Sequence, residues 1–317
     1  MKATLSVDLG GLVLRTPVMA AAGCLRDPKD LHGLVDVRKL GGIVTPSITM
    51  YPLTGSLTPR VAESASGVLT STGWQNSGVE AFLEHELPAF ARTGVPVFVS
   101  IAGQSVEEYV RVARALHGAA GVAALEVNLA CGDVERGGGL FAHRADWAAE
   151  VVGAVSRLSR FPVFAKLSPE VPDIVDIAGS CVQAGANGLT LINGVPGMGI
   201  SPRSLQPQLG SLTGTLSGPA VKPIAIRAVY LVSRALPDVP ILGVGGIAET
   251  KDAVEMMLAG ASAVQVGTSM LVNPSSPVDI TKGVLAYLRA VGLSDPSQIR
   301  GSLRLPQPPP VDDDGTA

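Results

Sequence analysis

A cysteine lies between a short, mostly apolar run and a glycine-rich stretch, where a thiol could meet a substrate. The run covers residues 122–127 and is typical of a buried strand. Asn128 and Cys131 follow it, and consecutive glycines occupy 137–139. Because glycine permits many backbone conformations, we expect a mobile loop here rather than a tightly packed one. A thiolate can act as a base, so the spacing predicts Cys131 as an acid/base residue.

A lysine and a second asparagine stand at the ends of other apolar runs. Lys166 lies near the end of residues 162–167, where an unpaired ammonium would be costly to bury. Two interpretations are open: a structural ion pair, or a cation held against a cofactor such as a flavin, at its N1–C2=O edge. Asn193 ends a further run. Together with Asn128 it could grip a planar, amide-bearing ring, although a buried asparagine usually only satisfies backbone groups.

The elements that would position these residues alternate regularly. Eight apolar segments recur, and most are continuous rather than alternating in polarity, which is typical of strands covered on both faces by helices; they are 18–22, 42–49, 95–102, 122–129, 162–167, 188–192, 240–244 and 263–266. Amphipathic segments predict helices at 79–92, 106–117, 145–158, 174–184, 218–236, 251–259 and 280–290, with Ser105 and Thr250 as N-caps. This α/β alternation predicts a single (β/α)8 TIM barrel over residues 1–304.

Two connections are longer than a barrel requires. Residues 50–77 follow the second predicted strand, and residues 194–217 follow the sixth. Both leave the carboxyl ends of their strands, where barrels form sites, so we expect them to be functional. The Pro- and Asp-rich segment 305–317 is predicted to be a disordered tail.

Two glycine clusters predict a phosphate site. Gly243–Ile247 ends the seventh predicted strand, and Gly267–Thr268 ends the eighth. Glycine lets backbone N–H groups approach an anion closely, and the loops after these two strands of a barrel often bind phosphate. The pattern is not GxGxxG, so a Rossmann dinucleotide site is not indicated.

The composition argues against several classes of protein. A net charge of −3 and 4% aromatic residues give no basic or stacking surface for nucleic acid. The apolar runs are too short to predict a membrane span. Cys24, Cys131 and Cys181 form no CxxC motif and no metal-ligand cluster, which favours a reducing compartment and a cytoplasmic location. Ala21–Cys24 has the form of a lipoprotein cleavage site, but no uninterrupted apolar segment precedes it.

Taken together, the motifs resemble those of class 1 dihydroorotate dehydrogenases, closest to the subclass that pairs with an iron–sulfur flavoprotein subunit. The resemblance covers about residues 5–290 and rests on Ala21–Cys24, Thr58–Gly67, Gln75–Asn76, Asn128–Cys131, Ala165–Pro169, Leu216–Pro223, Gly243–Gly246 and Val266–Thr268. It implies an FMN-binding barrel, a homodimer and an electron-transfer partner that carries FAD and an iron–sulfur cluster. The chain itself lacks the four cysteines that such a cluster needs.

The resemblance also implies roles for single residues. The FMN phosphate would be bound by Gly245, Gly246, Gly267 and Thr268. The flavin would be lined by Ala22, Gly23, Ser47, Ser100, Lys166 and Gly218, with the lysine at the N1–C2=O edge. The substrate would be contacted by Thr70, Gly73, Trp74, Asn128, Asp133 and Asn193. Cys131 would remove a proton from the substrate carbon beside a carbonyl, while hydride passes from the neighbouring carbon to flavin N5.

Departures from the family pattern concentrate on the substrate side. Pro46 stands where the family has a lysine that touches both flavin and orotate. The other replacements are Thr70 and Asp133 for asparagines, Gly194 for a hydroxyl residue, Ser100 for a flavin-side asparagine and Trp74 for a smaller aliphatic residue. Losing a cation and gaining a carboxylate should weaken binding of an anion such as orotate. Asp133 could also raise the pKa of the nearby thiol through like charge.

We therefore expect an FMN-dependent oxidoreductase that acts on a CH–CH bond beside a carbonyl. The departures favour a small cyclic carbonyl or amide substrate altered from dihydroorotate, with Trp74 as a stacking wall. One alternative is an authentic dihydroorotate dehydrogenase of pyrimidine biosynthesis. Another is a non-catalytic flavin-binding subunit, against which the retained Cys131 and Lys166 argue.

Overall fold

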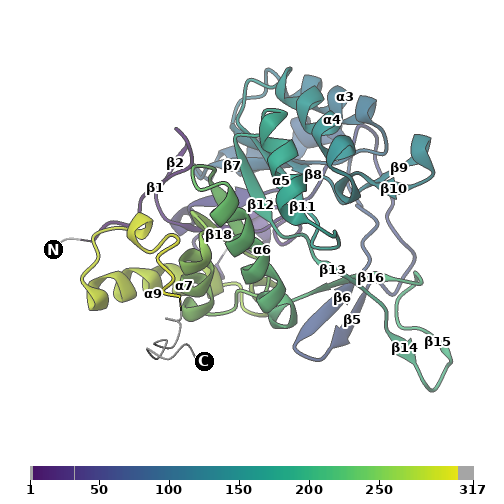
Figure 1. Ribbon diagram of the computed structural model, residues 1–317. Coiled ribbons are helices and arrows are strands. Elements are labelled where there is room, and N and C mark those ends of the chain that lie inside the picture. The colour runs from purple at the N-terminus through teal and green to yellow at the C-terminus, as the bar shows by residue number, and fades with distance from the viewer. Residues whose placement is uncertain (1–2, 32, 306–317) are drawn as a thin grey trace, which may run out of the picture.

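Eight parallel strands close into a barrel, as predicted (Figure 1). The computed structural model describes residues 3–31 and 33–305. In their order around the barrel the strands are β3 (Val18–Ala20), β4 (Gly42–Val44), β7 (Val97–Ile101), β8 (Val122–Asn128), β11 (Val163–Leu167), β12 (Gly188–Leu191), β17 (Ile241–Val244) and β18 (Ala263–Val266). Neighbouring strands are parallel throughout, so their carboxyl ends meet at one end of the barrel, called the mouth here.

Helices follow the strands close to the predicted positions. They are α1 (Val79–Ala81), α2 (Leu87–Ala91), α3 (Val106–Leu116), α4 (Ala145–Ser156), α5 (Ile174–Gln183), α6 (Lys222–Ala235), α7 (Thr250–Ala259), α8 (Thr268–Val272) and α9 (Ser276–Val291), and a π-helical turn joins α1 to α2. The Ser105 side chain caps α3 by accepting a hydrogen bond from Glu108 N at 3.3 Å, as predicted. The N-cap prediction for Thr250 is wrong, because Glu249 caps α7 in a capping box with Asp252.

The amino end of the barrel is closed by apolar side chains. A hairpin of β1 (Val7–Asp8) and β2 (Val13–Leu14) brings Leu9 and Leu14 against the barrel interior. There, Phe98 and Phe164 meet edge to face with ring centroids 5.4 Å apart. This floor removes apolar surface from water, so polar groups higher in the barrel can face only one another or the mouth.

The two long connections form a sheet that the sequence did not predict. In the first, β5 (Val61–Ser64) pairs with β6 (Gly67–Thr70); in the second, β13 (Val195–Gly197) pairs with β16 (Gly214–Ser217), and β16 pairs with β6. Figure 1 shows this antiparallel sheet, with the hairpin of β14 (Ile200–Ser201) and β15 (Gln206–Pro207), beyond the barrel strands. The second barrel strand is accordingly shorter than predicted and ends at Val44.

Two more predictions concern the tail of the chain and membrane-spanning segments. Of the predicted tail, residues 306–317 lie outside the described residues, and Leu305 is exposed. Within the described part of the chain, no helix combines the length and apolar character that crossing a membrane requires.

Replacing Gly188 by alanine should destabilise the barrel floor. An added Cβ would lie 2.3 Å from a ring atom of Phe164, so we expect a loss of about 1–3 kcal/mol in the free energy of unfolding. Gly179→Ala is the control, because a Cβ there meets nothing within 4 Å in the interior of α5 and should stabilise by about 0.5–1 kcal/mol. Chemical denaturation of both variants measures the difference. If Gly188→Ala were as stable as Gly179→Ala, the floor would tolerate overpacking.

Candidate functional site

Four side chains from different parts of the barrel form one hydrogen-bonded chain at the mouth. The hydroxyls of Ser47 and Ser100 are 2.8 Å apart, and Asn128 Nδ2 donates to Ser47 Oγ at 3.1 Å. Asn193 Nδ2 donates to Asn128 Oδ1 at 2.8 Å. The structure thus brings together both asparagines that were expected to face one mouth and links them to Ser47 and Ser100, which were expected to line the flavin. These hydrogen bonds orient Asn128 and Asn193 before any ligand binds.

Cys131 lies just beyond β8 and is packed rather than loosely held. The residue is 0% exposed and belongs to the main apolar core. Its Sγ lies 3.3 Å from the carbonyl oxygen of Asn128, which also accepts the Tyr109 hydroxyl at 2.6 Å. The expectation of loose packing at this thiol is therefore wrong, because Sγ packs beside Tyr109 of α3.

Burial dominates the protonation of this thiol. Desolvation raises the pKa of Cys131 to about 12, while hydrogen bonding from Tyr109 and from the backbone of Gly103 works in the opposite direction. The carboxylate that adds to the rise is Glu108, not Asp133 as expected. A thiol in these surroundings is kept protonated at neutral pH and is a strong base once it loses its proton.

The glycine-rich stretch after Cys131 is a short hairpin. Strand β9 (Gly132–Asp133) pairs with β10 (Gly139–Leu140), and Gly137 and Gly138 adopt positive φ angles at its turn. Asp133 is 1% exposed, its Oδ1 accepts the Glu135 amide at 3.0 Å, and its Oδ2 lies 3.4 Å from Arg136 Nε. Arg136 also pairs with Glu150 and lies over the Trp147 ring. Arg136 therefore offsets the negative charge of Asp133 only in part, because the same guanidinium also pairs with Glu150 at 2.6 Å.

Lys166 forms an ion pair inside the barrel. This confirms the first of the two interpretations of the residue, a structural ion pair. Its Nζ lies 3.2 Å from Glu126 Oε1, and the other carboxylate oxygen accepts Thr190 Oγ1 and Gln265 Nε2, each at 3.0 Å. The Lys166 side chain is 8% exposed and that of Glu126 is 0% exposed, so the ammonium lies on the outer side of the pair. The ion pair and a contact with a ligand at the mouth are therefore compatible.

Backbone glycines crowd the mouth at the ends of β17 and β18. Gly218, Gly245 and Gly246 have φ angles of 95°, 131° and 72°, values that favour glycine. A Cβ on Gly246 would lie within 2.8 Å of Lys222 backbone atoms at the start of α6, and one on Gly218 would contact Thr268. The backbone here approaches a helix N-terminus closely, which is the geometry that binds phosphate.

Side chains hold this glycine cradle in place. Thr268 Oγ1 donates to Ser217 Oγ at 2.8 Å. Lys222 Nζ donates to Asp252 Oδ1 at 2.6 Å, while Asp252 Oδ2 accepts the amides of Ala248 and Glu249, both at 2.9 Å. Lys222 and Asp252 were not expected from the sequence. A capping-box search around 249–252 would have found the aspartate.

The end of β3 contributes the other side of the cradle. Gly23 has φ +81° with nothing within 4 Å of an added Cβ, and Ala22 is half-buried. Burial raises the pKa of Cys24 to about 11, and the charge of Lys166 lowers it. Cys24 Sγ lies 3.8 Å from the position that a Cβ added to Gly267 would occupy. Lys166 therefore lies close to the same corner of the mouth as the glycines.

The three predicted substrate residues in the first long connection lie on or next to the antiparallel sheet. Thr70 is the last residue of β6, and its hydroxyl donates to the Thr215 carbonyl at 3.5 Å. Gly73 and Trp74 have positive φ angles, and Trp74 is half-buried against the main core. Their position beyond the barrel fits a cover over the mouth.

Three further residues support the site without having been predicted. Arg60 ties this connection together by donating to the carbonyls of Ser56 and Thr54 and to the Gln75 side chain at 2.6, 2.9 and 2.6 Å. Glu126 and Gln265 lie inside apolar strands, and a charged or amide residue within such a run was the signal that could have found them.

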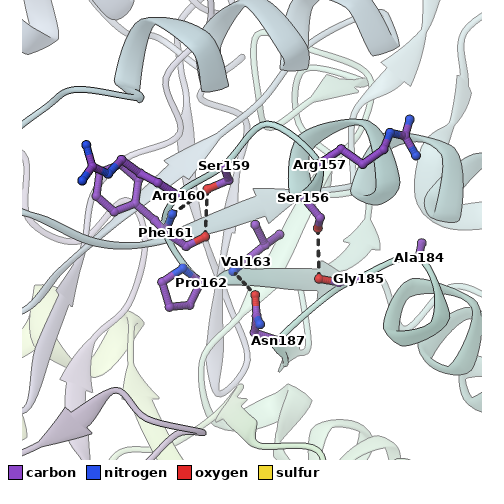
Figure 2. Close-up of a pocket in the computed structure, with 10 residues that line it drawn as sticks. All are labelled: Ser156, Arg157, Ser159, Arg160, Phe161, Pro162, Val163, Ala184, Gly185 and Asn187. Atoms are coloured by element: carbon purple, nitrogen blue, oxygen red, sulfur yellow. Dashed lines mark hydrogen bonds between the residues drawn. The ribbon is translucent and has the colours of Figure 1, made fainter.

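A separate cavity of about 550 Å³ lies at the other end of the barrel (Figure 2). It is lined by residues before β11 and β12 and at the carboxyl ends of α4 and α5, among them Arg157, Phe161 and Asn187. Asn187 Oδ1 accepts the Val163 amide at 2.8 Å, and Ser156 Oγ donates to the Gly185 carbonyl at 3.1 Å. These polar groups serve the local backbone, and the cavity is not part of the mouth.

The comparisons with known proteins agree with the geometry. The family described as dihydroorotate dehydrogenase matches residues 4–288. This chain belongs to the dihydroorotate dehydrogenase family. It is 43% identical over 304 residues, 96% of this chain and 99% of the relative, to the "Dihydroorotate dehydrogenase B (NAD(+)), catalytic subunit" of Geotalea daltonii. A relative of the same name from Desulforamulus reducens is 44% identical over 305 residues, 96% of this chain and 100% of that protein.

Membership of the family makes the chain an FMN-dependent oxidoreductase. The residues present fit that cofactor: backbone that leaves no room for a Cβ at Gly246 lies against the start of α6, and the buried Lys166 is level with Asn128 with 8% of its side chain exposed. Gly245, Gly246, Gly267 and Thr268 would hold the phosphate of FMN. Lys166 would face the ring.

Replacing Gly246 by alanine should weaken FMN binding. The φ angle of 72° and the Lys222 backbone within 2.8 Å of the new Cβ force the cradle to shift, so we expect the Kd for FMN to rise about tenfold or more. Gly94→Ala is the matched control. It has a similar φ of 66° with nothing within 4 Å and lies before β7, away from the mouth. Fluorescence titration of the apoprotein with FMN measures both, and an unchanged Kd for Gly246→Ala would contradict the assigned cradle.

Proposed function

We propose that this chain oxidises dihydroorotate to orotate as the catalytic subunit of a dihydroorotate dehydrogenase. The observation that carries the proposal is the identity of 43–44% to dihydroorotate dehydrogenase B catalytic subunits over nearly the whole of both chains. The alternative of authentic dihydroorotate oxidation, set beside an altered substrate in the sequence analysis, is thus the better supported one. The name "catalytic subunit" likewise argues against a non-catalytic flavin-binding protein.

The residues at the mouth would divide the reaction between them. FMN, when bound, supplies the acceptor for the hydride that leaves the substrate ring. Cys131 would take the proton from the carbon beside the carbonyl. Asn128, oriented by Ser47, and Asn193, oriented by Asn128, would bind the amide groups of the ring. Because Arg136 lies 3.4 Å from Asp133 and offsets part of its charge, this carboxylate would oppose an anionic substrate less than an unpaired one.

The electrons would leave through a second subunit. Relatives that carry NAD(+) and "catalytic subunit" in their names support an electron-transfer partner, and we propose one that contains FAD and an iron–sulfur cluster. A homodimer and a cytoplasmic location, the latter favoured by three free cysteines, are part of the same proposal.

Dihydroorotate should bleach the flavin of the purified holoprotein under anaerobic conditions. The proposal expects rapid loss of the oxidised-FMN absorbance, because hydride transfer needs no partner subunit. Stopped-flow absorbance measures the rate. Dithionite serves as the control, because it shows that the bound FMN can be reduced at all. Bleaching by dithionite but not by dihydroorotate would remove dihydroorotate as the substrate.

Cys131 should set the pH dependence of this reaction. The active form of a base is the thiolate, and burial places the pKa of Cys131 at about 12. The thiolate fraction, and with it the reduction rate, should therefore rise roughly tenfold per pH unit between about pH 7 and about pH 10. Cys131→Ala should lower the rate at least about a hundredfold, whereas Cys181→Ala, a buried thiol on α5, is the control. An unaffected rate in Cys131→Ala would exclude this thiol as the base.

A changed substrate is the second candidate, favoured by one observation at the mouth. Pro46, two residues after the end of β4 and beside Ser47, carries no charge where the resemblance implies a lysine that touches orotate. A neutral cyclic amide would not require that cation. Reduction of the flavin by such a compound, in the absence of a response to dihydroorotate, would favour this second candidate.

Restoring the cation should tell the two candidates apart. If orotate binds here, Pro46→Lys should strengthen its binding, because the new ammonium faces an anion in a partly buried site. We expect a decrease in the Kd for orotate of about fivefold to tenfold, with Pro46→Gln, similar in length but neutral, as the control. Titration of the flavin spectrum with orotate measures both variants. A Kd unchanged in Pro46→Lys would mean that position 46 does not face the substrate anion.

A further inference from the structure

The carboxylate beneath the mouth is more fully coordinated than a simple ion pair requires. Glu126 is 0% exposed and accepts hydrogen bonds from Lys166, Thr190 and Gln265 at 3.2, 3.0 and 3.0 Å. These donors come from β11, β12 and β18, and the carboxylate itself from β8. A buried charge needs such compensation. Half of the barrel strands therefore join in holding one negative charge at a fixed point.

That carboxylate lies against the lysine that would face the cofactor. The Lys166 side chain keeps 8% of its surface exposed, whereas Glu126 keeps none. On the outer side, the charge of Lys166 reaches Cys24, which packs near Gly267 of the cradle. Lys166 thus stands between Glu126 and the FMN site. The Glu126 carboxylate therefore both holds the Lys166 ammonium in place and opposes its positive charge.

We propose that Glu126 positions Lys166 and offsets its charge, and thereby sets how strongly the site prefers reduced over oxidised FMN. A positive group beside the N1–C2=O edge favours the more negative, reduced ring. A carboxylate 3.2 Å from that ammonium weakens the preference while keeping the lysine oriented. Glu126 is a positioning residue, since its own contacts are with Lys166, Thr190 and Gln265. The inference requires bound FMN and is independent of which substrate is oxidised.

The test is the reduction potential of FMN in the holoprotein. Glu126→Gln gives the pair a net charge of +1, Lys166→Gln gives −1, and the double variant, like the natural pair, is neutral. The potential should therefore be highest in Glu126→Gln, lowest in Lys166→Gln, and intermediate in the natural chain and the double variant. We expect each single change to alter the ratio of affinities for reduced and oxidised FMN about tenfold or more, which is about 30 mV for a two-electron couple. Spectroelectrochemical titration measures this order.

Two controls separate charge from packing. Thr190→Val removes a donor to the same carboxylate but no charge, so its potential should stay near that of the natural chain. Glu126→Asp keeps the negative charge, so its reduction potential should lie closer to that of the natural chain than to that of Glu126→Gln. If Glu126→Gln does not fold, the comparison of Lys166→Gln with the double variant still measures the carboxylate. Equal potentials in that comparison, or equal shifts in Glu126→Gln and Glu126→Asp, would overturn the proposal.

Discussion

A single buried charge pair governs how the interior of this barrel is arranged. Glu126 and Lys166 lie above an apolar floor that contains Phe98 and Phe164. The floor offers no water and no partner to a charge, so every compensating group must come from the strands at the same level or from the mouth. Removing either partner would leave an uncompensated buried charge, which is strongly destabilising. The interior is therefore apolar at one end, polar in the middle and open to a ligand at the other.

The two halves of the mouth depend on different kinds of structure. The half around β17 and β18 would hold the cofactor phosphate with backbone amides, and the glycines there are required by positive φ angles and close approach. The half around β4, β8 and β12 acts through side chains such as Ser47, Asn128 and Asn193. Backbone recognition changes little when side chains change, so the cofactor can be kept while the substrate side varies. The departures at Pro46 and Gly194 fall on the variable half.

The sequence was sufficient for the barrel because each strand is a continuous apolar run followed by an amphipathic segment. It was insufficient for the antiparallel sheet of β5, β6, β13 and β16, whose pairing joins segments far apart in sequence and leaves no periodic signal within either one. For Cys131, glycine content did not reveal the packing against Tyr109, which depends on how α3 approaches β8. The ion pair of Lys166 was one of two open interpretations, because a partner 40 residues away is visible only once β8 and β11 are neighbours.

The burial of Cys131 carries two opposite consequences for a base. Desolvation raises its pKa to about 12, so the thiolate is scarce near neutral pH but strongly basic when it forms. Exposure to water would make the thiolate more abundant and less basic, and would also open it to oxidation. The contacts with Tyr109 and the Gly103 backbone lower the pKa from within the buried site, and so recover part of the lost thiolate without admitting water. The hairpin of β9 and β10 begins at the residue after Cys131, so a change in the packing of this hairpin would also change how far water reaches the thiol.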